Sequence, residues 1–125
     1  MHTDKFFVMK YNRDILLQLH KELLDIVREV VRVCDICDIP YFIQGGTAMG
    51  AHFFDGIVPW DDDIDVGMTR ENYERFLREA PAHLSSDYFL ECFATEKNTP
   101  FYFSKVRRNN TLFVEEIWRN MDIHH

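Results

Sequence analysis

The sequence predicts an α+β fold in which a mixed β-sheet is flanked by helices, one of them long and close to the N-terminus. Three observations lead to this fold class: a helical hydrophobic period over residues 13–37, a strand, glycine turn and helix over residues 41–54, and acids that alternate with aliphatic residues over residues 63–66. The chain has 125 residues, the size of one domain, so we expect residues 1–125 to form a single core.

The long helix is predicted by apolar residues that recur every three or four positions from about Arg13 to Cys37. Charged residues lie between them, as in an amphipathic helix with one buried face. Pro40 favours an end just before it, because the residue that precedes a proline is disfavoured in the helical conformation. The spacing of Cys34 and Cys37 is also that of a redox or zinc pair, but a helix C-terminus suits neither site, so we expect two core thiols.

A short strand, a glycine turn and a second helix follow. Residues 41–43 are apolar and predict a buried strand, Gly45 and Gly46 break it, and a helical pattern runs from Thr47 to about Phe54. The first N–H groups of a helix have no partner within the helix and attract anions. Gly45, Gly46 and Thr47 are therefore candidate phosphate-binding residues, although a glycine pair alone more often marks a structural turn.

Asp61, Asp63 and Asp65 alternate along the next predicted strand. Alternate side chains of a strand point to the same face, so the three carboxylates would project together while Ile64 and Val66 face the other way. Carboxylates this close repel one another, and a divalent cation such as Mg²⁺ or Mn²⁺ relieves the repulsion. A solvated acidic turn is the alternative. We predict Asp63 and Asp65 as metal ligands, with Asp61 as a further candidate.

The rest of the chain predicts one helix and several strands. Thr69 is a suitable N-cap for a helix over residues 70–80. Strands are expected over residues 88–92, 100–106 and 111–115. The last two would be joined by a basic hairpin turn over residues 107–110. Lys105 and Arg107 are further candidate phosphate ligands, with a solvated turn as the alternative for Arg107.

The composition narrows the class of protein. A formal net charge of -7 argues against a nucleic-acid binder, because affinity for the phosphate backbone comes from lysine and arginine. No apolar run reaches the roughly 20 residues of a membrane-spanning helix, and no secretory signal is recognisable at the start. We therefore expect no transmembrane segment and a cytoplasmic location, with the inner face of the membrane as an alternative. Three cysteines fit reduced thiols in that compartment.

Taken together, the segments resemble the LicD-type phosphotransferases, which include fukutin-related proteins and belong to the nucleotidyltransferase superfamily with a polymerase-beta-like core. The resemblance covers most of the chain. Its most specific string is Pro59-Trp60-Asp61-Asp62-Asp63-Ile64-Asp65. Further matching strings are Asp38-Ile39-Pro40-Tyr41, Gly46-Thr47-Ala48-Met49-Gly50-Ala51 and Lys105-Val106-Arg107-Arg108-Asn109-Asn110-Thr111.

The resemblance implies transfer of a phosphorylated alcohol from a CDP-linked donor to a sugar of a cell-surface glycan precursor, as in lipopolysaccharide or teichoic acid modification. Phosphocholine is the first candidate for the transferred group, with CDP-choline as its donor. It implies that Asp63 and Asp65 are catalytic and hold Mg²⁺ or Mn²⁺, and that residues 45–47 contact phosphate. Metal ions on a pyrophosphate would neutralise the charge that builds up on the leaving CMP.

Two departures from the family pattern keep other functions open. Phe53 and Phe54 stand where family members usually carry Arg-His, and the third carboxylate expected after a His-His-Gly segment is absent, because the chain stops at His124-His125. We therefore expect a LicD-like domain that lacks its C-terminal part. One alternative is a catalytically incomplete fragment or paralogue that acts as a binding or interaction module. Another is a nucleotidyltransferase that adds a nucleoside monophosphate to a small molecule or a protein.

Overall fold

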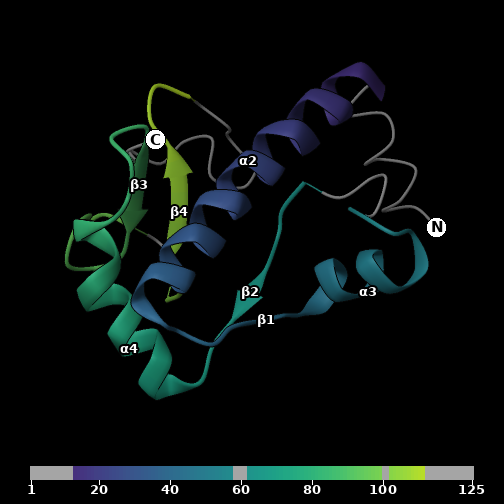
Figure 1. Ribbon diagram of the computed structural model, residues 1–125. Helices are drawn as coiled ribbons and strands as arrows, with labels where there is room; N and C mark the ends of the chain where they lie inside the picture. The colour runs from purple at the N-terminus through teal and green to yellow at the C-terminus, as the bar shows by residue number, and fades with distance from the viewer. Residues whose placement is uncertain (1–12, 58–61, 100–101, 112–125) are drawn as a thin grey trace.

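The computed structural model describes residues 13–57, 62–99 and 102–111. The elements in chain order are α2 (Arg13–Cys37), β1 (Phe42–Ile43), α3 (Gly45–Phe53), β2 (Val66–Gly67), α4 (Arg70–Glu79), the 3₁₀ turn η1 (Ala80–Ala82), β3 (Tyr88–Glu91) and β4 (Lys105–Arg108). Figure 1 shows α2 crossing the molecule diagonally, with α4, β3 and β4 towards one side of the view and α3 towards the other. Helices and small sheets together confirm the α+β class.

The strands of this part of the chain form two separate antiparallel sheets. β1 pairs with β2 through Phe42 opposite Gly67 and Ile43 opposite Val66. β3 pairs with β4 along the full length of both strands. The single mixed sheet that we predicted is therefore not what the described residues form. The nucleotidyltransferase core stays a prediction at this point.

The core lies where the C-terminal half of α2 meets α4 and β3. Its buried apolar residues are Val30, Val33, Cys34, Cys37, Ile39, Phe76, Ala80 and Leu90. The prediction of two core thiols in α2 is confirmed, and burial raises the pKa of the Cys34 thiol to about 11, which keeps it protonated at neutral pH. Cys92, the last residue of the predicted strand 88–92, is only half-buried and follows the end of β3.

The end of α2 is fixed by its own backbone and by α4. Asp38 adopts a positive φ of 53°, which ends the helix one residue before the proline rule alone requires. The guanidinium of Arg75 in α4 donates to the carbonyl oxygens of Cys37 at 2.7 Å and of Asp38 at 3.3 Å. The last carbonyls of a helix have no partner within it, so Arg75 supplies the missing donors and joins α4 to α2.

A buried carboxylate on α2 holds the segment between η1 and β3. The Glu29 side chain accepts hydrogen bonds from Arg32 at 2.6 and 3.0 Å and from the Ser85 N–H at 2.7 Å. Arg32 also donates to the carbonyl of His83 at 2.6 Å. The hydrogen bond from Arg32, opposed by burial, holds the pKa of Glu29 below its ordinary value.

The helix over residues 70–80 is confirmed as α4, and Thr69 caps it as predicted, accepting the Asn72 N–H at 3.4 Å. Figure 1 places α4 beside the end of α2. Phe76 is its buried residue and reaches the core. No helix in the described ranges is both long enough and apolar enough to cross a membrane.

The strand predicted over residues 100–106 lies further along the chain than expected. β4 starts at Lys105 and runs to Arg108, so Arg107 and Arg108 lie in a strand and the predicted basic turn is confined to residues 109–110. Arg108 pairs with Glu22 of α2, and the turn contains Asn110 with a positive φ of 63°. The limits of β4 therefore depend on partners that are far away in the sequence. Of the predicted strand 111–115, residues 112–115 lie outside the described residues.

Candidate functional site

The glycine turn is the first turn of α3 rather than a loop before it. The helix begins at Gly45, which has a φ of 60° and so adopts a left-handed conformation that suits glycine. Gln44 is extended, and its carbonyl accepts the Ala48 N–H at 3.3 Å. The predicted start at Thr47 was therefore two residues late, and the glycine pair itself presents the first N–H groups of the helix.

Asp65 lies directly beside this turn. Its N–H donates to Thr47 Oγ1 at 2.7 Å, and its carbonyl accepts the Gln44 N–H at 3.3 Å. A Cβ added at Gly45 would lie 3.4 Å from Asp65 Oδ2, so the missing side chain lets the carboxylate approach the helix start. The structure thus brings together the glycine turn and one of the two carboxylates, which are 18 residues apart in the chain.

Replacing Gly45 with alanine is expected to cost about 1–2 kcal/mol of stability, because an L-residue is strained at this φ. Gly56→Ala is the matched control, since a Cβ there meets only the Phe54 carbonyl at 3.9 Å. Urea unfolding followed by circular dichroism measures both variants. Equal free energies of unfolding for the two variants would show that the turn is not under this constraint.

The carboxylate strand is shorter than the alternation predicted. The ladder reaches only Val66 and Gly67, because β1 offers two residues before the chain turns into α3. Asp63 is exposed and Asp65 half-buried in the irregular segment that leads into β2, so strand geometry does not place them on one face. Asp61 lies outside the described residues.

Asp63 and Asp65 are the two acids of the predicted metal site that the structure describes. Within the ranges that the structure describes, no group of three His, Cys, Asp or Glu side chains is placed to hold a metal. Mg²⁺ is commonly held by one or two carboxylates together with substrate phosphates and water, so the donor set of Asp63 and Asp65 suits such an ion. Their role as ligands stays a prediction.

Lys105 and Arg107 lie on the other sheet, in β4. Arg107 forms an ion pair with Glu91 at 3.3 Å, and both side chains are largely buried. Its guanidinium also lies 4.9 Å from the centre of the Phe89 ring. Lys105 Nζ lies 5.9 Å from the centre of the Phe103 ring. Arg107 therefore has a structural partner that the local sequence did not reveal, and the phosphate-binding role of both residues stays a prediction.

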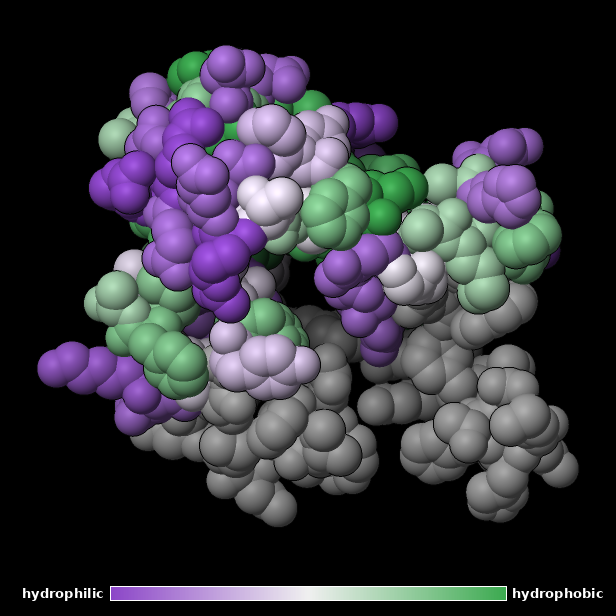
Figure 2. Space-filling model, turned by 90° about the horizontal axis from the view of Figure 1, so that it is seen from below, coloured by the Kyte–Doolittle hydropathy of each residue, from purple (hydrophilic) through white to green (hydrophobic). Residues whose placement is uncertain are grey.

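The strand over residues 41–43 was predicted to be buried, and this prediction is wrong. Phe42 is 51% exposed and Ile43 41% exposed, because β1 pairs with β2 alone. The Phe42 ring lies over Gly67, where an added Cβ would come within 2.3 Å of it. Phe53 and Phe54, in place of the expected basic pair, are also exposed. Figure 2 shows hydrophobic surface over α3 at the right and hydrophilic surface over α4 at the left.

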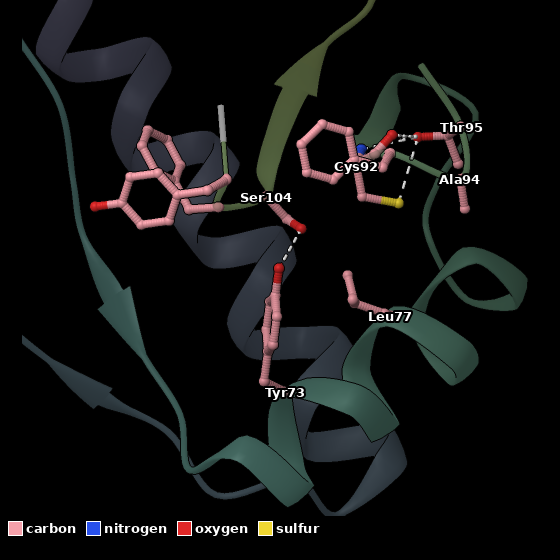
Figure 3. Close-up of a pocket in the computed structure, with 9 residues that line it drawn as sticks. Tyr73, Leu77, Cys92, Ala94, Thr95 and Ser104 are labelled. Atoms are coloured by element: carbon pink, nitrogen blue, oxygen red, sulfur yellow. Dashed lines mark hydrogen bonds between the residues drawn. The ribbon is translucent and has the colours of Figure 1, made fainter. Parts of the chain in front are cut away.

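A pocket lies between α4, the end of β3 and the start of β4. Its volume is about 220 Å³. Figure 3 shows the Tyr73 side chain rising from α4 towards Ser104, with Leu77, Cys92 and Thr95 on the other side. The hydroxyl oxygens of Tyr73 and Ser104 are 2.6 Å apart. Tyr102 and Phe103 fall within the predicted strand over residues 100–106, and their clustering with Tyr73 and Phe93 around one hollow depends on contacts between distant segments.

Comparison with known proteins agrees with the resemblance. Residues 38–124 match the family described as LicD/FKTN/FKRP, nucleotidyltransferase domain. The chain is 49% identical over 45 residues to the lipopolysaccharide cholinephosphotransferase LicD of Haemophilus influenzae, which is 36% of this chain and 17% of that protein. It is 30% identical over 100 residues to the ribitol 5-phosphate transferase FKRP of Mus musculus, which is 78% of this chain and 20% of that protein. The matches thus span a fifth or less of these relatives, and no solved structure matches the chain.

Proposed function

The chain belongs to the LicD/FKTN/FKRP nucleotidyltransferase family, and we propose on this basis that it serves the metal-dependent transfer of a phosphorylated alcohol from a CDP-linked donor to a sugar of a cell-surface glycan precursor. The names of the two relatives support a phosphoalcohol as the transferred group, cholinephosphate in one and ribitol 5-phosphate in the other. Phosphocholine is the first candidate for the transferred group, because the relative named for cholinephosphate transfer has the higher identity over its aligned segment.

One observation supports this proposal most directly: the contact between Asp65 and the first turn of α3. Thr47 Oγ1 accepts the Asp65 N–H at 2.7 Å, so the hydrogen of the Thr47 hydroxyl can still be donated to a phosphate oxygen. The N–H groups of Gly45 and Gly46 lie at the same helix start, where partial positive charge favours phosphate. A carboxylate beside a phosphate-binding turn is the pairing that a metal-assisted phosphoryl transfer needs.

In this proposal each group has a separate task. The turn binds the donor pyrophosphate and fixes its orientation. An acceptor hydroxyl attacks the phosphorus that bears the alcohol and gives its proton to solvent water, and CMP leaves with the electrons of the broken P–O bond. Asp63 and Asp65 would hold Mg²⁺ or Mn²⁺, which when bound supplies positive charge against the negative charge of the leaving group.

The expected result of the Asp63→Asn, Asp65→Asn double substitution is loss of metal binding and of transfer together. Mn²⁺ titration followed by electron paramagnetic resonance should show at least tenfold weaker binding, because both carboxylates are removed. CMP release from CDP-choline or CDP-ribitol, with a saccharide acceptor, should fall at least ~100-fold, as when charge stabilisation of a transition state is lost.

Asp35→Asn is the control, because Asp35 is an exposed acid on α2 and is not one of the proposed site residues. The purified relative from Haemophilus influenzae serves as the positive control for the assay. Equal Mn²⁺ binding by the wild-type chain and the double variant would refute the metal site. If the wild-type chain released no CMP while the relative did, the binding-module alternative would hold. A product that retained the nucleotide would favour the nucleotidyltransferase alternative.

A further inference from the structure

The pocket between α4, β3 and β4 has aromatic walls that are open to solvent. Among the side chains that line it, Tyr102 is 90% exposed, Phe93 61% and Phe103 46%. A single exposed aromatic residue is unremarkable, but three around one hollow form a surface suited to stacking. At about 220 Å³ the pocket is smaller than the roughly 300–1,000 Å³ that encloses a drug-sized ligand, so it fits one small ring.

Most hydroxyl groups that line the pocket already form hydrogen bonds within the protein, which disfavours a ligand with many hydroxyls. The Thr95 hydroxyl donates to the Leu90 carbonyl at 2.6 Å and accepts the Cys92 N–H at 2.9 Å, so it is already committed. The hydroxyls of Tyr73 and Ser104 bond to each other at 2.6 Å, which uses one of their two hydrogens. Of the hydroxyl hydrogens in this pair one remains, which suits a single ring carbonyl better than the several hydroxyls of a sugar.

The charges around the pocket argue against a cationic ligand. Aromatic rings can hold a quaternary ammonium group, but here Lys105 Nζ lies 5.9 Å from the centre of the Phe103 ring, where its positive charge would repel a choline group. The Arg70 guanidinium lies 5.3 Å from the centre of the Tyr73 ring and is paired with Glu74 at 3.3 Å, so its charge is largely offset. The charge of Lys105 attracts phosphate, so a neutral flat ring that carries phosphates matches both the walls and the margin of the pocket.

We propose that this pocket binds the pyrimidine ring of the cytidine-linked donor, with Tyr102 as a stacking partner, the Tyr73 and Ser104 hydroxyls as the donor to the ring carbonyl, and Lys105 beside the phosphates. This inference rests on the proposed function for the identity of the donor. Stacking of a base on an aromatic side chain is general chemistry and requires no metal.

The test is a metal-free nuclear magnetic resonance titration of the whole chain with CMP, choline chloride and galactose as separate probes. CMP should shift the amide signals of Ala94, Thr95 and Ser104. Tyr102→Ala should weaken CMP binding roughly tenfold, the loss expected when a base loses one stacking partner, and Tyr73→Phe should weaken it several-fold. Since Tyr102 is 90% exposed, its removal should leave the fold intact.

Phe53→Ala is the matched control, because Phe53 is a 71% exposed aromatic residue at the end of α3 and outside the pocket. CMP binding should be the same in this variant as in the wild type. Unchanged pocket signals with CMP, equal affinity of Tyr102→Ala and wild type, or binding of choline or galactose in place of CMP would each overturn the proposal.

Failure of this proposal can be told apart from failure of the proposed function. If CMP binds the pocket while no CMP is released from any CDP-linked donor, the pocket stands and the transferase proposal fails. If CMP is released and the pocket variants keep the wild-type KM for the donor, the transferase proposal stands and the base binds elsewhere.

Discussion

Arg107→Ala is expected to destabilise the protein by about 3 kcal/mol, because it leaves the buried Glu91 carboxylate without its cation. Glu91 is 4% exposed and accepts the Thr99 hydroxyl at 2.9 Å, a hydrogen bond too weak to replace an ion pair. Urea unfolding measures the loss. The exposed Arg78 is the control, and Arg78→Ala should change stability by less than about 0.5 kcal/mol.

The double variant Glu91→Gln, Arg107→Met sharpens this test. Replacing both partners removes the uncompensated charge, so it should cost less than the two single changes added together. A loss below about 1 kcal/mol for Arg107→Ala would contradict the structural role of the pair. A large loss means that low activity of an Arg107 variant cannot be credited to lost phosphate binding without measuring its folded fraction.

Glu29→Gln is expected to cost about 2 kcal/mol at neutral pH, because the charged acceptor of Arg32 and of the Ser85 N–H is removed. Glu29 is 7% exposed, so water does not replace these hydrogen bonds. Urea unfolding at pH 7 measures the loss. The exposed Glu74, paired with the exposed Arg70 on α4, provides the control Glu74→Gln, which should change little.

The Glu29 carboxylate should also make the stability of the protein fall at acidic pH. The folded-state pKa of Glu29 is lowered, mainly by the hydrogen bond from Arg32, so its stabilisation is present above the ordinary glutamate pKa of about 4.3 and is lost as pH falls through the folded-state value. Stability of the wild type should therefore fall more steeply below that pH than stability of Glu29→Gln. Parallel curves for the two proteins would show that Glu29 does not contribute.

The helices could be predicted because their causes are local. The apolar period of α2, the cap at Thr69 and the apolar face of α4 are all visible within a few residues of sequence. Even the end of α2 was placed correctly, although the positive φ of Asp38 and the hydrogen bonds from Arg75 were not foreseen.

The strands could not be placed from sequence with the same success, because their limits depend on partners. β2 stops short of Asp63 and Asp65 since β1 is only two residues long, a fact that no pattern within residues 61–66 contains. β4 includes Arg107 and Arg108 because acids on β3 and α2 pair with them. The contact of Asp65 with Thr47 was not predicted, because the family resemblance implied only that both residues belong to one phosphate-handling site.

The hydrogen bonds from Arg75 to the end of α2 have a consequence for how the candidate site can vary. Asp38 and Arg75 are 37 positions apart, and the chain between them holds β1, α3 and β2 (Figure 1). This stretch is a closed loop whose two ends are joined to the helical body formed by α2 and α4. Closing a loop costs only about 0.6 kcal/mol more for each doubling of its length. Insertions around α3 can therefore reshape the site while the body that carries it keeps most of its stability.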